Sequence, residues 1–178
     1  VLIKRKSAAI GLLSMQIALL LFHISALIPI AELGDQLRQR PVRRVADQMN
    51  KEHRPGEPLA MVGVMKPSLH FHTRQVIVFE GNYDGALVNL ADRLANEQRR
   101  GWVGHPLGSK DASDTVLVAI DKRTSSLDHW RGLYPIELGC FGVYQLWRLD
   151  RKRLVQRADA LKADGVDLNW RQPRPERF

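Results

Sequence analysis

The chain has 178 residues, a formal net charge of +8 and a single cysteine. One cysteine excludes an intrachain disulfide and a thiolate zinc site, and the length suits one domain of roughly 100 to 150 residues with an attached segment. The positive charge favours anionic membrane surfaces, phosphate-bearing lipids or nucleic acid as partners, without selecting among them.

A long apolar segment lies near the N-terminus, between Ser7 and Ala31. Its 25 residues contain no Asp, Glu, Lys or Arg. As a helix rising about 1.5 Å per residue they reach roughly 37 Å, enough to cross a hydrocarbon core of about 30 Å. The segment is longer than the apolar part of a signal peptide, about 7 to 15 residues, and too apolar all round for a surface helix. We therefore predict a transmembrane helix within residues 1–31.

The surroundings of this segment predict a larger membrane protein. The chain begins with Val1 rather than Met, so we expect residues 1–31 to be the last span of a longer chain. Gln16 and His23 share one helical face, where they can contact a neighbouring helix instead of lipid. Basic residues lie on both sides of the segment, so the distribution of positive charge does not determine its orientation.

The remaining sequence predicts a small α/β domain over residues 41–165, after a stalk at 32–40 and before a tail at 166–178. Apolar strands are predicted at 59–64, 76–79, 115–120 and 143–149, the last at a half-exposed edge. Helices are predicted from Pro41, after Asn82 or Asp84, at 125–131 and after Asp150. Strands that alternate with helices favour a mostly parallel sheet with helices on both faces.

Short catalytic signatures are absent: the sequence has no P-loop, G-x-G-x-x-G, G-x-S-x-G or H-E-x-x-H. We therefore expect no self-contained active site, no cofactor and no metal. His70 and His72 leave one alternative open, because on a strand both imidazoles would face the same way and supply two ligands of a metal-dependent hydrolase. A third ligand would come from an acid or from another histidine: His53, His105 or His129. The simpler expectation is two polar side chains beside a core-facing Phe71, with Cys140 as a small buried hydrophobe.

Two groups of residues are candidate contact sites for anions. Loops that follow strands of α/β sheets commonly bind ligands. The candidates for contact with a ligand or a lipid phosphate are therefore Lys66, Ser68, His70, His72 and Arg74. The region just after the apolar segment carries candidates for contact with the membrane surface: Arg38, Arg40, Arg43 and Arg44. A further basic cluster contains Arg151, Lys152, Arg153 and Arg157. Ordinary solvated loops and faces remain the alternative for all of them, and no nucleic-acid-binding module is recognised.

One stretch of the chain resembles a known family. The apolar segment, a helix, the strand LAMVGVM and then KPSLHFHTRQVIVFEG resemble the C-terminal end of bacterial membrane glycosyltransferases of the protein mannosyltransferase and aminoarabinose transferase superfamily. A Pro-Ser-Leu-x-Phe-Tyr-like turn of that family is matched by Pro67, Ser68, Leu69 and Phe71. His72 replaces the usual Tyr, and Arg74 stands where a basic residue often follows. The later stretches NLADRLANEQRRG and VYQLWRLDR also suit the domain.

The resemblance implies a multi-span enzyme that transfers a sugar from a polyprenyl-phosphate carrier to an acceptor outside the cytoplasm. It places the parent protein in the inner (cytoplasmic) membrane and the α/β domain on the extracytoplasmic side. The catalytic acid of that family lies far upstream, so no residue of this chain inherits the role. The implied partners are the upstream transmembrane domain, the lipid-linked sugar and anionic headgroups, not nucleic acid. The alternative is a singly anchored α/β binding or assembly module without enzymatic activity.

Overall fold

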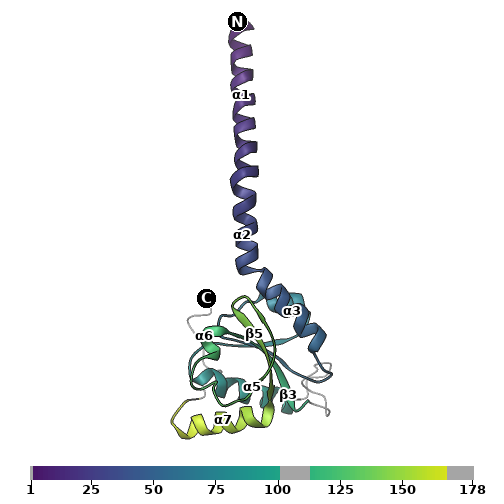
Figure 1. Ribbon diagram of the computed structural model, residues 1–178, viewed down its shortest axis with the longest axis vertical. Coiled ribbons are helices and arrows are strands. Elements are labelled where there is room, and N and C mark those ends of the chain that lie inside the picture. The colour runs from purple at the N-terminus through teal and green to yellow at the C-terminus, as the bar shows by residue number, and fades with distance from the viewer. Residues whose placement is uncertain (1, 101–112, 168–178) are drawn as a thin grey trace. The chain divides into compact units, whose positions relative to one another are not determined.

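The computed structural model describes residues 2–100 and 113–167 (Figure 1). The chain divides into two units, Val1–Arg40 and Pro41–Phe178. The first unit is helical, and the second contains the sheet and its covering helices. The tail predicted at 166–178 lies mostly outside the described residues, although Val166 packs against the core.

The first unit contains helix α1 (Leu2–Phe22), a short π-helix η1 (His23–Leu27) and helix α2 (Ile28–Arg38). By length and composition, the stretch Ile10–Arg38 is able to cross a membrane, with a mean hydropathy of 2.0 and none of the tested window buried. The apolar side chains along this helix point outward, which matches the apolar segment predicted from the sequence. Helical structure continues through the predicted stalk to Arg38.

The π-helix η1 precedes Pro29, near the start of α2. A proline inside a helix has no N–H to donate, and its ring crowds the carbonyl four residues earlier. The wider π turn accommodates such a residue without ending the helix. Within the same stretch, His23 Nδ1 donates to Leu19 O at 2.8 Å and Ser25 Oγ donates to Leu21 O at 2.6 Å. These polar side chains are therefore satisfied inside the helix itself.

The second unit is built on a five-stranded sheet of order β2-β1-β3-β5-β4. The strands are β1 (Leu59–Val62), β2 (Ile77–Glu80), β3 (Thr115–Asp121), β4 (Ile136–Phe141) and β5 (Tyr144–Asp150). β1 pairs in parallel with β2 and β3, whereas β5 is antiparallel to both β3 and β4. Among these strands β5 alone runs opposite to the rest, so the predicted α/β class with a mostly parallel sheet is confirmed.

Helices cover both faces of this sheet. Helices α3 (Arg40–Glu52) and α4 (Ser68–Thr73) pack on one face, and α5 (Gly85–Arg100) and α7 (Arg151–Ala163) on the other. Strand β3 shows how the two cores arise, because its side chains alternate between the faces. Val116, Val118 and Ile120 belong to the core beneath α5 and α7, and Leu117 and Ala119 to the core beneath α3 and α4.

Three local predictions were wrong. The strand predicted at an edge, 143–149, is β5, which lies between β3 and β4. The true edge strand, β4, was missed because Gly139 and a register shift interrupt its alternation. The helix predicted at 125–131 is α6 (Lys122–Ser125), which begins earlier because Asp121 caps it. Cys140 lies on the edge strand and is exposed, not buried.

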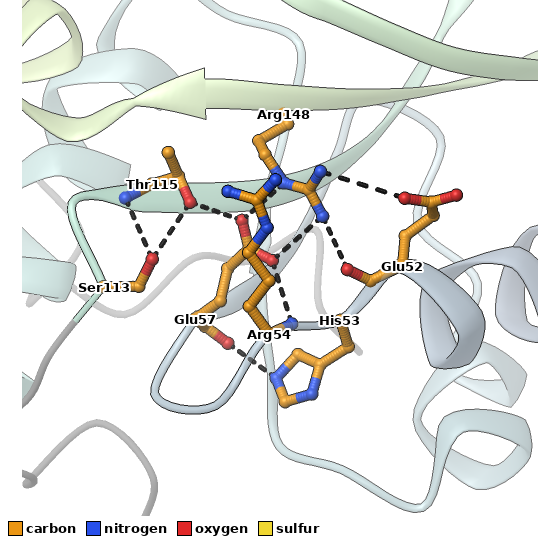
Figure 2. A network of polar contacts seen from close by, with 7 residues as sticks. All are labelled: Glu52, His53, Arg54, Glu57, Ser113, Thr115 and Arg148. Carbon is orange, nitrogen blue, oxygen red and sulfur yellow. Dashed lines mark hydrogen bonds and ion pairs between the residues drawn. The ribbon is translucent and has the colours of Figure 1, made fainter.

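A buried ion pair joins α3, β3 and β5 at the amino end of β3 (Figure 2). Arg148 of β5 is 5% exposed, and its Nε donates to Glu57 Oε1 at 2.9 Å. The same guanidinium donates through Nη2 to Glu52 O at the end of α3. Thr115 Oγ1 and the backbone N–H of Arg54 also donate to the Glu57 carboxylate. The interaction therefore fixes the loop between α3 and β1 against the sheet.

Replacing Arg148 with Met is expected to lower the free energy of unfolding by about 3 to 5 kcal/mol, because Glu57 would stay buried without its partner. The double variant Glu57→Gln, Arg148→Met removes both charges and should be more stable than the single variant. Urea denaturation followed through the fluorescence of the buried Trp130 and Trp147 measures both. Unchanged stability of Arg148→Met would contradict a structural role for the pair.

Candidate functional site

The carboxyl ends of β1, β2 and β3 lie side by side and form a crevice. The chain passes from β1 to β2 through α4 on one face, and from β2 to β3 through α5 on the other. After β3 the chain continues through α6 to Trp130 and Leu133, which belong to the core on the α5 side. The segments that follow the adjacent strands β1 and β3 therefore lie on opposite faces of the sheet. In open α/β sheets, ligands bind in the crevice at such a point.

Asp121, the last residue of β3, organises the crevice. Its Oδ2 accepts hydrogen bonds from Val64 N at 3.0 Å and from Thr124 Oγ1 at 2.6 Å. Its Oδ1 accepts from Arg123 N at 3.0 Å and Thr124 N at 3.1 Å. Burial by itself would raise the pKa of Asp121, but these hydrogen bonds outweigh it and hold the pKa below its ordinary value. The carboxylate is thus ionised at neutral pH and ties the loop after β1 to the loop after β3.

Gly63 permits the close approach between these two loops. It has a φ of +90°, and a Cβ at this position would lie 1.7 Å from Asp121 Oδ2. Its backbone N–H donates to Glu80 O at 3.0 Å, which holds the end of β1 to the end of β2. A residue with a side chain would be strained by this backbone conformation and would collide with the carboxylate.

A cavity of about 360 Å³ opens at this crevice. Its lining combines exposed polar groups with the buried carboxylate and comprises Val64, Asn82, Asp121, Arg123, Thr124, Ser126 and Leu127. Amide, hydroxyl and guanidinium groups can donate hydrogen bonds to the oxygen atoms of a polar or anionic ligand. The described lining residues include no histidine or cysteine. The arrangement is therefore suited to holding a polar or anionic ligand.

A second hollow of about 360 Å³ adjoins the first, and Leu127 lines both. His129 is buried beside it, with Nδ1 3.4 Å from Asp84 Oδ1. Its Nε2 is buried without a hydrogen-bond partner among the described residues. Burial lowers the pKa of His129, and the nearby Asp84 offsets this only in part. The imidazole is therefore neutral at pH 7.

The residues predicted as ligand contacts do not form one cluster. Lys66 and Ser68 lie where α4 begins, at the crevice end of the sheet, and both are partly buried. Exposed Arg74 caps the other end of α4 in a left-handed conformation with φ of 56°. A helix of six residues is about 9 Å long, so Lys66 and Arg74 are held apart.

The alternative of a metal site on His70 and His72 is contradicted by α4. Residues two apart on a helix lie about 200° apart around its axis, so the imidazoles do not share a face. Phe71, expected in the core, is 79% exposed because Leu69 and Thr73 form the buried side of α4. No group of three or more His, Cys, Asp or Glu able to hold a metal occurs among the described residues; His105 lies outside them.

The predicted membrane-surface arginines are exposed, as such a role requires: Arg38, Arg40, Arg43 and Arg44. Sequence reasoning missed the two residues that shape the crevice, Asp121 and Gly63. Both leave a signal in the sequence. An aspartate that ends an apolar strand three residues before a threonine is a typical helix cap, and a glycine inside an apolar run marks close backbone approach.

The chain combines a helix able to cross a membrane with a mostly parallel α/β domain that carries a polar crevice. These features define its class: an α/β domain attached to a membrane-type helix. A family model, the cyanobacterial RgtA-type glycosyltransferase C-terminal domain, matches residues 52–165. Because the match covers more than half of the chain, the chain belongs to this family. The predicted relation to a glycosyltransferase C-terminal region is thereby confirmed. No curated protein and no solved structure gives a significant match.

Gly63→Ala is expected to lower the free energy of unfolding by about 3 kcal/mol or more, through backbone strain and collision with Asp121. Gly132→Ala is the matched control, because Gly132 has a φ of +81° but open space around its Cβ position. Backbone strain alone should cost the control about 1 to 2 kcal/mol. Thermal denaturation of the two variants measures the difference, and equal losses would contradict the close contact.

Asp121→Asn is expected to lower stability at pH 7 and to change its pH dependence. The native pKa of Asp121 lies below that of unfolded aspartate, about 3.9, so the unfolded chain binds more protons in that range. The stabilisation is present above the unfolded pKa and is lost as the pH falls through the native pKa. The variant should therefore lose less stability than the unmodified chain between about pH 5 and the native pKa. Denaturation at several pH values tests this, with exposed Asp47→Asn as the control.

Proposed function

We propose that this chain is the C-terminal part of an integral-membrane glycosyltransferase that transfers a sugar from a polyprenyl-phosphate carrier to an extracytoplasmic acceptor. The observation that carries the proposal is the family match over residues 52–165, directly after a helix long and apolar enough to cross a membrane. A lipid-linked donor is anionic and confined to the membrane, so an enzyme that uses it is expected to be anchored there. The net charge of +8 favours such a donor electrostatically.

The α/β domain acts by binding and positioning, not by chemistry. At its crevice the Asp121 carboxylate accepts four hydrogen bonds from its own chain, which makes it an anchor for the two loops. The exposed Asn82 and Arg123 beside it are suited to holding polar groups. The upstream transmembrane domain then catalyses sugar transfer. The α/β domain packs against it on the extracytoplasmic side of the inner membrane.

Sugar transfer is tested on membranes that contain the full-length protein. Membranes supplied with a radiolabelled polyprenyl-phosphate sugar should release label to an acceptor, and membranes that lack the protein should not. Equal turnover in both preparations would contradict the transferase function. A chain that anchors in the membrane without any turnover would favour the alternative, a singly anchored binding or assembly module.

The exposed Cys140 offers a direct test of the predicted side of the membrane. In intact cells, a membrane-impermeant maleimide is expected to label Cys140 of the full-length protein to the same extent before and after lysis. Cys140→Ser is the matched control, because it removes this thiol from an exposed edge strand. Protection that ends only on lysis would place the domain in the cytoplasm and contradict the proposed topology.

A further inference from the structure

Three loops meet at the crevice end of the domain and form one surface. Tyr144 Oη donates to Val64 O at 3.3 Å, and Lys122 N donates to Val143 O at 2.9 Å. Val64 N in turn donates to Asp121 Oδ2. The loop after β1, the loop after β3 and the turn between β4 and β5 are therefore held together by hydrogen bonds.

This surface combines exposed aliphatic and basic side chains. Val64 is 51% exposed, Met65 38% and Val143 54%. Lys122 and Arg123 are exposed beside them, and Lys66 is partly exposed. We define this set as the tether edge: Val64, Met65, Lys66, Lys122, Arg123 and Val143. Aliphatic side chains flanked by basic ones are suited to the boundary between the headgroups and acyl chains of an anionic bilayer.

The covalent connection to the apolar helix reaches the domain at the same end. A Cβ at Gly142, next to Val143, would lie 3.1 Å from Pro41 Cγ. Pro41 is three residues beyond Arg38, the last residue of α2, and three residues span at most about 11 Å. Helix α3, with 13 residues and therefore about 20 Å long, separates this end from the Arg148–Glu57 pair. Pro41, the residue with which the sheet unit begins, therefore lies at the end of that unit that carries the tether edge.

The distribution of charge favours an anionic partner for the tether edge. Exposed Arg43 and Arg44 lie near the start of α3, a few residues after Pro41. Exposed acids of the same end lie toward the separate hollow around His129: Asp84 and Asp128 line it, and Asp167 follows Val166, which lines it too. Asp121, which precedes Lys122 of the tether edge, is buried and accepts hydrogen bonds from its own chain. The accessible charge around the three aliphatic side chains is therefore positive.

We propose that the tether edge docks on the anionic surface of the membrane that the apolar helix crosses, with Val64, Met65 and Val143 entering the headgroup region. The docking turns the adjoining crevice, with Asn82 and Arg123, toward the plane in which a lipid-linked substrate moves. Each basic side chain near an anionic surface shifts the docked population by about fivefold. The inference rests on the membrane anchoring in the proposed function, and the experiment measures the two separately.

The test uses the full 178-residue chain in nanodiscs of phosphatidylcholine with phosphatidylglycerol. An NBD label is attached through Val143→Cys in a Cys140→Ser background, and shallow doxyl-labelled lipid serves as the quencher. Val155→Cys is the matched control, because Val155 is an exposed valine of α7, which begins at the opposite end of β5. Quenching at position 143 is expected to exceed quenching at 155 at least twofold.

Removing the charge should weaken the docking. The variant Lys66→Gln, Lys122→Gln, Arg123→Gln is expected to reduce quenching at position 143, and so are discs of phosphatidylcholine alone or 0.5 M salt. These last two conditions need no variant, so they test the charge effect even if the substitutions impair folding. Equal quenching at 143 and 155, or a label at 143 that is shielded from the lipid quencher by protein, would overturn the proposal. A chain that fails to co-purify with the discs would overturn the anchoring itself.

Discussion

The ion pair between Arg148 and Glu57 is the interaction on which the arrangement of the domain depends. It holds the loop between α3 and β1 against β3 and β5, and so determines where β1 enters the sheet. Burying two charges is costly, and the pair is tolerable because further hydrogen bonds from Thr115 and Arg54 satisfy the Glu57 carboxylate. At the other end of β3, Asp121 plays the corresponding part with four hydrogen bonds. The strands that carry the crevice are thus fixed at both ends by carboxylates.

The two ends differ in what they leave exposed. At the Arg148 end the polar groups are directed at one another, and the guanidinium is buried. At the Asp121 end, by contrast, Asn82 and Arg123 remain exposed at a cavity, and aliphatic side chains lie at the surface. Ligand binding in α/β sheets is expected at this second end, because the loops diverge there. Pro41, the first residue of the sheet unit, lies at that end as well, beside Gly142.

Sequence periodicity was sufficient for the elements with one strongly apolar face. The spacing of Val42, Val45, Ala46 and Met49 predicts α3. The continuous apolar run at 59–64 predicts a strand buried on both faces, and all four residues of β1 are buried. Where periodicity was weak, the prediction failed: a bulged edge strand carries little pattern, and the six residues of α4 are too few to distinguish a helix from a turn. The prediction of the candidate site was the least accurate, because the positions of Lys66 and Arg74 depend on that short helix. Tertiary hydrogen bonds such as those of Asp121 have no periodic signal at all.

The order of elements also links the stability of the domain to its anchor. The family match begins at residue 52, where α3 ends, yet α3 supplies Val42, Val45, Ala46 and Met49 to one of the two cores. Without these side chains, Leu59, Met61, Leu117 and Leu146 would be left facing water on one side of the sheet. Burying such residues contributes about 1.5 to 3 kcal/mol each. The sheet domain therefore completes its core with α3, the helix that follows the apolar segment in the chain. The same residues of α3 thus stabilise the fold and connect the domain to the apolar segment.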